Sequence, residues 1–223
     1  MTTVPLGPIV TATPLALPGF EFHVGKAVAL EPRSTRHVDD LWEAGHAADM
    51  SWAYLKYGPF PTKDAMAAHI ARITGLEQQP FFAVIPASSG KAEGWASFCD
   101  IAPSDAAIEI GSIWLSPRLQ RTRAATEAIF LMMQHAFALG YYRVAWRCNA
   151  LNAASMRAAR RFGFAYEGKW RGDGIVKRRR RDTAWFSIVE PDWPAQCALF
   201  EAWLDDSNFD ADGVALKPLL ASA

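Results

Sequence analysis

The residues with the clearest chemical potential lie between Ile108 and Phe164, where the sequence predicts a strand, a turn, a helix, a second strand and a second helix. The stretch RLQRTRAATEAIFLMMQHAFALG, which begins at Arg118, contains the turn and the first helix. A tight turn into a helix leaves several N–H groups without partners at the positive end of the helix macrodipole. Ala124 and Ala125 are small enough to let an anion approach this backbone. We therefore predict a diphosphate site at the start of this helix.

Cysteine and histidine chemistry is less well supported by the sequence. Cys99, Cys148 and Cys197 are scattered, odd in number and without metal-ligand spacing, so we predict no metal site and favour a reducing, cytoplasmic setting. Cys148 is a candidate nucleophile, but no His or Asp stands at a supporting position, and a strand cysteine is usually a small core residue. His135 falls in the middle of the first helix and is interpreted as structural.

The amino-acid composition limits the classes of protein to which this chain can belong. With 223 residues, 51% of them hydrophobic, the chain can bury the core of one domain with appendages. Its net charge of zero creates no field toward nucleic acid or membrane, and it has no uninterrupted run of eighteen apolar residues. The apolar first twenty residues are broken by four prolines and follow no Lys or Arg, so we interpret residues 1–26 as an extended arm rather than a signal peptide.

The elements that must position these residues follow from apolar periodicity and turn residues. Strands are predicted at 27–31, 81–86, 92–101, 107–115, 141–149, 164–170 and 182–189, and helices at 35–50, 62–73, 122–139, 152–161 and 192–204. The first strands form an antiparallel meander, and the strand–helix–strand unit after residue 107 predicts a right-handed crossover. The last twenty residues are expected to be loosely held.

At Gln120–Ala125, QRTRAA, the chain resembles the Q/R-x-x-G-x-G/A signature of the GNAT family of N-acetyltransferases. Further similar segments follow in the family's order: the strand with Glu109, then TEA at 126–128, NAAS at 152–155 and GF at 163–164. EGKWR at 167–171 and RDTAWFS at 181–187 resemble the RimJ/RimL branch, which acetylates the N-termini of ribosomal proteins, and WAYLKYGPF at 52–60 is similar to one bacterial subgroup.

The resemblance covers roughly residues 28–194 and implies an α/β (α+β) fold. Its sheet would be mixed and largely antiparallel, with about six or seven strands and helices on both faces. The chain then divides into an arm at 1–26, an acetyltransferase domain at 27–194 and a helical tail at 195–223.

The resemblance also implies acetyl-CoA as the cofactor. The pantetheine arm would pair with free strand backbone at 113–115, and Asn152 would both cap its helix and contact pantetheine or substrate. The implied cofactor-binding residues are Ile113, Trp114, Leu115, Gln120, Arg121, Thr122, Arg123, Ala124, Ala125, Thr126, Asn152 and Ser155.

One departure from the signature is Arg123, which replaces the family's central glycine. Arginine fits if the backbone is right-handed helical, whereas a positive φ would require glycine. We hypothesise that the guanidinium compensates by binding a phosphate bidentately. The alternative is a side chain that points to solvent.

The catalytic residues are less clearly implied. Glu109 aligns with the general base of histone-acetylating members, and by alternation it shares a face with Gly111 and Ile113; the alternative is an exposed strand glutamate. The tyrosine that acts as acid in the family is Ala159 here. Ser155 could replace it through its hydroxyl or an ordered water, as a serine is thought to do in RimL-like enzymes; the alternative is a first-turn serine that satisfies backbone donors.

The pKa values of amines restrict the class of amine that can serve as acceptor. An α-amine with a pKa near 8 costs about 1.4 kcal/mol to deprotonate at neutral pH, whereas a lysine amine near 10.4 costs roughly 4.6 kcal/mol. We therefore expect a protein N-terminal amine as acceptor. The alternatives are a small amine, such as an amino sugar, polyamine or amino-acid derivative, or a protein that binds acyl-CoA without turnover.

The acceptor pocket is expected from residues 52–60 and the final strand pair. Trp52, Tyr54, Tyr57 and Phe60 could attract an ammonium by cation–π contact, or could simply be core or lid residues. The basic run 177–181 fits a solvated hairpin better than a nucleic-acid site, and it could also steer an acidic substrate or the 3′-phosphate of the coenzyme. We expect no membrane or nucleic-acid partner, and either a monomer or a homodimer.

Overall fold

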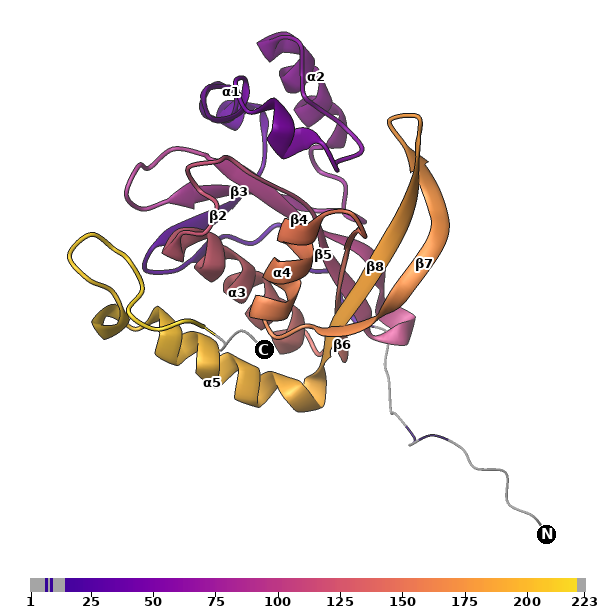
Figure 1. The fold of residues 1–223 in the computed structure, drawn as a ribbon, viewed down its shortest axis with the longest axis vertical. Coiled ribbons are helices and arrows are strands. Elements are labelled where there is room, and N and C mark those ends of the chain that lie inside the picture. The colour runs from indigo at the N-terminus through magenta and orange to yellow at the C-terminus, as the bar shows by residue number, and fades with distance from the viewer. Residues whose placement is uncertain (1–6, 8, 10–14, 220–223) are drawn as a thin grey trace.

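One sheet of eight strands runs through the described part of the chain, in the order β1-β2-β3-β4-β5-β6-β8-β7 (Figure 1). The strands are β1 (His23–Val24), β2 (Val28–Pro32), β3 (Phe81–Pro86), β4 (Gly94–Ala102), β5 (Ala107–Leu115), β6 (Arg143–Asn149), β7 (Ala165–Val176) and β8 (Arg179–Val189). All neighbours are antiparallel except β5 and β6, which are parallel. The mixed, largely antiparallel sheet is thus confirmed, and the short β1 is the strand that the sequence did not predict.

The structure is a computed structural model that describes residues 7, 9 and 15–219. Part of the predicted N-terminal arm, residues 1–6, 8 and 10–14, lies outside the described residues, as do residues 220–223. Within the described part, no helix has the length and apolar character needed to cross a bilayer.

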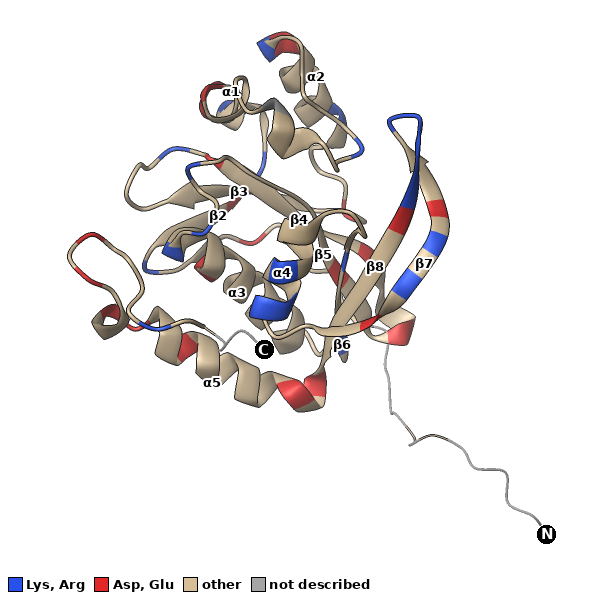
Figure 2. Cartoon of the chain, viewed as in Figure 1, with Lys and Arg blue, Asp and Glu red and all other residues tan. Residues whose placement is uncertain are grey.

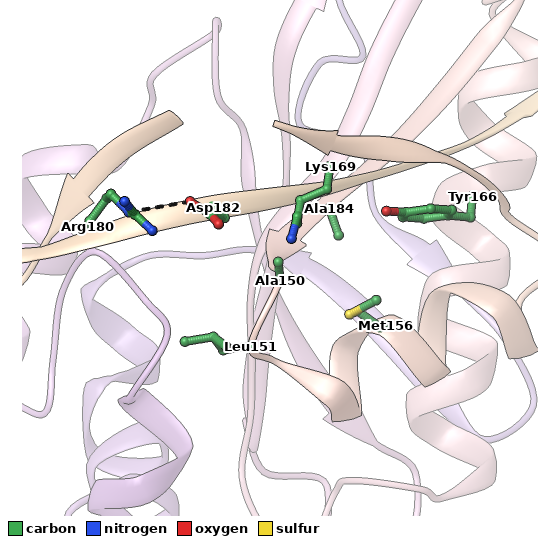
Figure 3. A pocket seen from close by; sticks show the side chains of 8 residues that line it. All are labelled: Ala150, Leu151, Met156, Tyr166, Lys169, Arg180, Asp182 and Ala184. Carbon is green, nitrogen blue, oxygen red and sulfur yellow. Dashed lines mark ion pairs between the residues drawn. The ribbon is translucent and has the colours of Figure 1, made fainter. Parts of the chain in front are cut away.

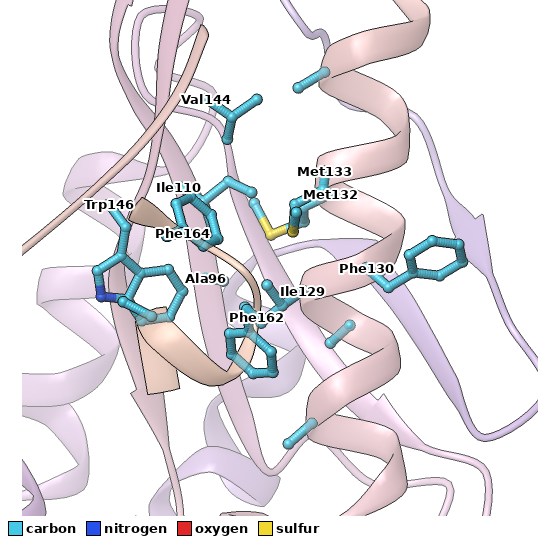
Figure 4. Packing of buried hydrophobic residues seen from close by; sticks show 14 of the residues in the cluster. Ala96, Ile110, Ile129, Phe130, Met132, Met133, Val144, Trp146, Phe162 and Phe164 are labelled. Carbon is cyan, nitrogen blue, oxygen red and sulfur yellow. The ribbon is translucent and has the colours of Figure 1, made fainter. Parts of the chain in front are cut away.

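Helices cover both faces of the sheet, as expected (Figure 1). The helices α1 (Val38–Gly45) and α2 (Lys63–Ile73) pack on one face, and α3 (Arg123–Ala138), α4 (Ala153–Arg161) and α5 (Trp193–Leu204) on the other. Two apolar clusters hold these layers. The larger joins α3 to the central strands, including Ile129, Met132 and Val144 (Figure 4), and the smaller lies under α1 and α2. Each large side chain buried in them contributes about 1.5–3 kcal/mol.

The predicted helix at 35–50 is shorter than expected. It is divided into a 3₁₀ turn at Thr35–His37, α1, and a second 3₁₀ turn at Asp49–Trp52. A Cβ at Gly45 would lie 2.7 Å from the indole of Trp114, so the end of α1 sits directly on that ring. The chain then turns back and stacks Trp52 on Trp114, with ring centroids 4.2 Å apart.

A buried carboxylate fixes α3 against the start of the sheet. Glu127 accepts hydrogen bonds from the backbone N–H groups of Lys26 and Ala27, at 2.8 and 2.6 Å. Gly25 permits this approach, because a Cβ there would lie 2.4 Å from the Glu127 carboxyl carbon. Charge-assisted bonds of this kind are the stronger class, so the N-terminal end of α3 is held in a defined place.

The end of the described chain also packs on the domain. Trp203 Nε1 donates to the Lys217 carbonyl at 2.8 Å, and Leu219 is buried in the larger cluster. The expectation of a loosely held tail is therefore wrong for residues 205–219. The sequence did not indicate this packing because the segment is polar and short, and only single residues hold it to the domain.

The basic run forms the tip of a long hairpin. Lys177 and Arg178 have φ angles of 49° and 64°, the pair of positive values that a two-residue type I′ turn requires. Arg178, Arg179 and Arg180 are exposed, and Figure 2 shows the hairpin tip as a basic segment beyond the sheet.

Candidate active site

The parallel strands β5 and β6 separate shortly after they begin. They pair at Ala107, Ile108 and Glu109, with Arg143, Val144 and Ala145 opposite. Beyond Glu109, β5 continues to pair with β4 as far as Leu115, while β6 pairs with β8 as far as Asn149. The edge of β5 that faces β6 therefore lacks a strand partner after this point, among the residues described. Backbone groups on such an edge are available to an amide-containing ligand.

A bulge in β5 changes which side chains share a face. Ser112 has a φ of 50°, and the register with β4 shifts between Gly111 and Trp114. As a result Ile113 packs in the larger cluster with Ile110, and the prediction that Ile113 shares a face with Glu109 is wrong. Gly111 does share that face, because a Cβ there would meet Glu109 Oε1 at 2.6 Å. Simple alternation fails here since one extra residue reverses the pattern.

The predicted anion site at the start of α3 has the expected local form. Thr122 is the N-cap, and its Oγ1 accepts from the Ala125 N–H at 3.1 Å. The N–H groups of Arg123 and Ala124 have no protein partner among the described residues. Arg121 supplies the turn, with a φ of 66°, while Arg123 is already helical and so does not need to be glycine.

The Arg123 side chain is directed to the C-terminal segment. Its guanidinium donates to the Leu204 carbonyl and to Asp206 Oδ1, and it lies 4.3 Å from the ring centroid of Phe209. The hypothesised bidentate phosphate contact would require these bonds to break. The structure thus gives Arg123 a role that joins α3 to residues 204–209, which neither of our two interpretations included.

The other implied cofactor residues surround the same turn. Gln120 Nε2 donates to the Leu115 carbonyl at 3.0 Å, which ties the turn to the end of β5. The Thr126 hydroxyl donates to the Thr122 carbonyl and accepts from Arg161, so it is already committed inside the protein. Trp114 is buried against Trp52, so only its backbone is available at the strand edge.

Glu109 lies at the point where β5 leaves β6. Its side chain is nearly buried, with 6% of the residue exposed, and Cys99 stands opposite it on β4. Burial raises the pKa of Glu109 to about 8, although a hydrogen bond with Cys99 and the charges of Arg181 and Lys56 act to lower it. A carboxyl with a pKa in this range is suited to accept a proton near neutral pH.

A guanidinium orients this carboxylate. Arg147 Nε donates to Glu109 Oε2, and the same side chain pairs with Asp100 and lies 4.7 Å from the ring centroid of Trp185. Arg147 favours the ionised form of Glu109 and so opposes the effect of burial on its pKa. We missed Arg147, although the alternation of β6 placed it opposite the face of the apolar residues. The sequence signal was that alternation places Glu109 and Arg147 on the same face of two neighbouring parallel strands, β5 and β6.

Ser155 lies in the first turn of α4, where Asn152 is the N-cap. Asn152 Oδ1 accepts from the Ser155 N–H at 3.1 Å, and Ser155 Oγ accepts from Trp146 Nε1 at 3.0 Å. The serine hydroxyl proton is not used in this bond, and Cys148 Sγ lies beside it as one acceptor. Burial raises the pKa of Cys148, and a hydrogen bond with Ser155 lowers it, so these two groups are adjacent. Ala159 is fully buried in the larger cluster, so its position offers no proton donor.

The loop 52–60, which was predicted to line the acceptor pocket, contacts two other elements. Tyr54 donates from its hydroxyl to the Leu151 carbonyl at 3.0 Å, and Lys177 Nζ donates to the Trp52 carbonyl at 2.7 Å. The loop 52–60 therefore touches both the start of α4 and the tip of the β7–β8 hairpin. Trp52 is only 1% exposed and belongs to the core under α1 and α2, as does the partly buried Phe60.

Tyr57 links the loop 52–60 to the bulge. Its hydroxyl donates to the Ser112 carbonyl at 3.0 Å and accepts from Trp95 Nε1 at 3.0 Å. Burial raises the pKa of Tyr57 to about 12, so the phenol is neutral. Tyr57 therefore fixes the bulge, and of the four predicted aromatic residues Tyr54 is the one that is exposed.

A pocket of about 430 Å³ lies between the start of α4 and the strands β7 and β8 (Figure 3). It is lined by Ala150, Leu151, Met156, Tyr166, Lys169, Arg180, Asp182 and Ala184. Ala184 belongs to the core on the α3 side, so this pocket opens on the face opposite the side chain of Glu109. None of the individually predicted site residues lines it, but Tyr166, Lys169, Asp182 and Ala184 come from the final strand pair that was expected to contribute to the acceptor pocket.

A diverging pair of parallel strands, a helix N-terminus with free N–H groups, and a buried carboxyl beside the divergence define an acyltransferase that uses a diphosphate-containing thioester. The family model of the acetyltransferase (GNAT) domain matches residues 28–165. The chain belongs to the GNAT acetyltransferase family, so acetyl-CoA is its acetyl donor and it is an N-acetyltransferase.

Solved structures agree with this assignment. The GCN5-related N-acetyltransferase from Brucella melitensis is 40% identical, with 94% of this chain and 96% of that chain covered and a TM-score of 0.91. A probable GNAT-family acetyltransferase from Chromobacterium violaceum ATCC 12472 is 38% identical over 87% of this chain and 99% of that chain, with a TM-score of 0.80. No curated protein sequence matches.

The RimL resemblance is more distant than the sequence segments suggested. RimL, the ribosomal L7/L12 alpha-N-protein acetyltransferase, is 20% identical over 76% of this chain and 94% of that chain, with a TM-score of 0.66. At this identity the likeness establishes the fold alone. Another structure with the same fold, also 20% identical and with a TM-score of 0.67, is a complex with acetyl-CoA and AMP.

Proposed function

We propose that this protein acetylates an α-amine, with the N-terminal amine of a polypeptide as the leading acceptor. The observation that carries the proposal is the buried Glu109, whose pKa is raised to about 8 at the divergence of β5 and β6. An α-amine titrates at about the same pH, so a proton passes between the two groups at little cost. A lysine side-chain amine near 10.4 would lose its proton to such a base at a cost of about 3 kcal/mol.

The residues at the start of α3 fit the diphosphate of acetyl-CoA. The N–H groups of Arg123 and Ala124 have no protein partner among the described residues, and an anion at the helix N-terminus would accept from them; the side chains of Ala124 and Ala125 are buried in the larger cluster. The free edge of β5 at 113–115 would hold the pantetheine amides. Acetyl-CoA supplies the acetyl group as a thioester, whose carbon–sulfur bond breaks as the amide bond forms.

Two side chains would assist the transfer, Glu109 at the amine and Ser155 at the departing sulfur. Glu109 accepts the proton that the amine loses, and Arg147 holds the carboxylate in position for this. Ser155, whose oxygen is oriented by the indole of Trp146, would donate a hydrogen bond to the departing thiolate and stabilise its charge, and the thiolate would take its proton from solvent. This use of Ser155 replaces the tyrosine that is absent at Ala159.

The narrow acceptor side favours a second candidate, a small amine. Tyr54 and Lys177 bridge the loop 52–60 to the start of α4 and to the hairpin tip, so a folded polypeptide end would have to displace these contacts. A small amino-acid derivative would not.

A panel of acceptors tests the proposal through release of CoA thiol. Peptides with a free α-amine and acetylated lysines should release thiol faster, by tenfold or more in kcat/KM, than peptides with a blocked N-terminus and free lysines. The reverse order would refute the α-amine assignment. Faster turnover of small amines than of any peptide would favour the second candidate.

We also propose a cellular compartment, a substrate class and a division of the chain into domains. We infer a cytoplasmic enzyme from the three cysteines, which are all unpaired. We keep the RimJ/RimL-like assignment as a hypothesis about substrate class, supported by the segments 167–171 and 181–187. The division at 1–26, 27–194 and 195–223 is likewise proposed, with β1 and residues 205–219 packed on the central domain.

A further inference from the structure

Arg33 is a buried cation without a counterion. It follows β2, and only 3% of the residue is exposed. Its Nε, Nη1 and Nη2 atoms are all buried and have no hydrogen-bond partner in the described part of the chain, and it forms no ion pair there. The guanidinium carbon lies 4.0 Å from the ring centroid of Phe81 and 4.6 Å from that of Trp95. Buried arginines are normally paired, so this arrangement requires an explanation.

The aromatic rings do not replace an anion. A cation–π contact offsets part of the cost of burial but leaves the five N–H donors of the guanidinium unsatisfied. Burial lowers the pKa of Arg33 to about 10, so the side chain is still charged at neutral pH. The titratable group that acts on it, Tyr57, is neutral there because burial raises its pKa to about 12. No carboxylate among the described residues balances the charge.

A second unpaired donor lies beside it. Nε2 of His69, on α2, is also buried without a partner. Burial lowers the pKa of His69 to about 4, and the charges of Arg33 and Arg72 act in the same direction. The imidazole packs against Tyr57 and Phe60, with ring centroids 4.6 and 5.1 Å apart. Two elements therefore bring unsatisfied nitrogens to one aromatic enclosure.

This enclosure is on the same face of the sheet as Glu109. The Arg33 N–H donates to the Phe81 carbonyl, Phe81 is in register with Ser97, and Ser97 with Gly111. These residues form one row across four strands, about 14 Å between the outer backbones. The Arg33 side chain extends along this row over Phe81 and Trp95, which shortens the distance to Gly111 and so to Glu109.

We propose that Arg33 and His69 bind a carboxylate carried by the acceptor while its amine faces Glu109. The inference rests on the proposed function and makes the acceptor an amine with a nearby acidic group. That group is either an Asp or Glu side chain near a polypeptide N-terminus or the α-carboxylate of a free amino acid. The partly buried imidazole of His69 turns aside to admit it, and the carboxylate then receives the bidentate bonds that Arg33 lacks and a bond from His69 Nε2.

Binding of acetate alone tests the site without turnover. The melting temperature of the wild type should rise by about 3 °C in sodium acetate relative to sodium chloride of equal ionic strength. Arg33→Met should abolish this rise, and Arg36→Met, which alters an exposed arginine on the following turn, should keep it. Equal effects of chloride and acetate, or no effect of either on the wild type, would overturn the proposal. Arg33→Lys serves if Arg33→Met does not fold, and it should weaken the acetate effect.

Paired acceptors then identify the source of the carboxylate. C-terminally amidated peptides with Glu or Gln at positions one to three are compared, and free amino acids are compared with their amides. The acid should exceed its neutral partner by about tenfold to 100-fold in kcat/KM in one of the two sets, and Arg33→Met should remove the difference. No preference for acid in either set refutes the acceptor assignment. Failure of every amine to be acetylated, with acetate binding intact, would instead refute the proposed function.

Discussion

Replacement of Glu109 by Gln removes a proton acceptor while preserving most of its shape. The pKa of Glu109, raised to about 8, makes the carboxyl about 9% ionised at pH 7, about half ionised at pH 8 and about 91% ionised at pH 9. The ratio of wild-type to Glu109→Gln kcat/KM should therefore rise about tenfold between pH 7 and pH 9. The ratio is informative because the ionisation of the acceptor amine affects both enzymes equally and cancels.

The assay follows thiol release with one peptide acceptor, at matched ionic strength, across this pH range. At pH 9 the loss in the variant should be about 10²-fold or more, the range of general base catalysis. Arg147→Met should move the rise of the ratio to higher pH, because the guanidinium favours the carboxylate. A ratio that is large but constant from pH 6 to pH 9 would refute the assignment of a base that titrates near 8. A ratio near one would exclude Glu109 from catalysis.

Three further substitutions separate the roles of neighbouring residues. Ser155→Ala should lower kcat by about 10²-fold through the lost hydrogen bond to the thiolate, and Ser155→Thr should retain more activity, since it keeps a hydroxyl. Equal activity of both variants and the wild type would exclude Ser155 from the reaction. Tyr54→Phe should change KM for the acceptor by a few-fold and leave CoA affinity unchanged, and a loss of CoA affinity in titration calorimetry would place Tyr54 elsewhere. Arg123→Met should lower the free energy of unfolding by about 1–3 kcal/mol in urea titrations through the lost bonds to Leu204 and Asp206. If it instead weakens CoA binding tenfold without affecting stability, the phosphate hypothesis for this side chain is restored.

The sheet and the helices were predictable because their signals are local. Apolar periodicity and turn residues predicted seven strands and five helices, and the turn before Thr122 predicted the helix N-terminus at which we place the anion site. The short β1 was not predictable, since a strand of two residues has no periodicity of its own. Its place depends on the capping of the β1–β2 turn by Glu127, a contact between residues a hundred positions apart.

The parts of the site that escaped prediction depend on register and on distant partners. The bulge at Ser112 moved Ile113 to the other face, and nothing in the local sequence marks that non-glycine residue for a positive φ. Arg147 and Arg123 find their partners in other elements, so their roles appear only when β6 and the C-terminal segment are in place. Trp52 belongs to an aromatic stretch that looks like a binding surface in sequence and is mostly core in three dimensions.

The central claim is tested most directly by a crystal structure of the enzyme with CoA, together with titration calorimetry on the same protein. The diphosphate should accept hydrogen bonds from the N–H groups of Arg123 and Ala124, and the sulfur should lie near Glu109 and Ser155. Binding of CoA elsewhere, for example by its phosphates at the basic hairpin tip 177–181, or no measurable heat of binding, would contradict the account.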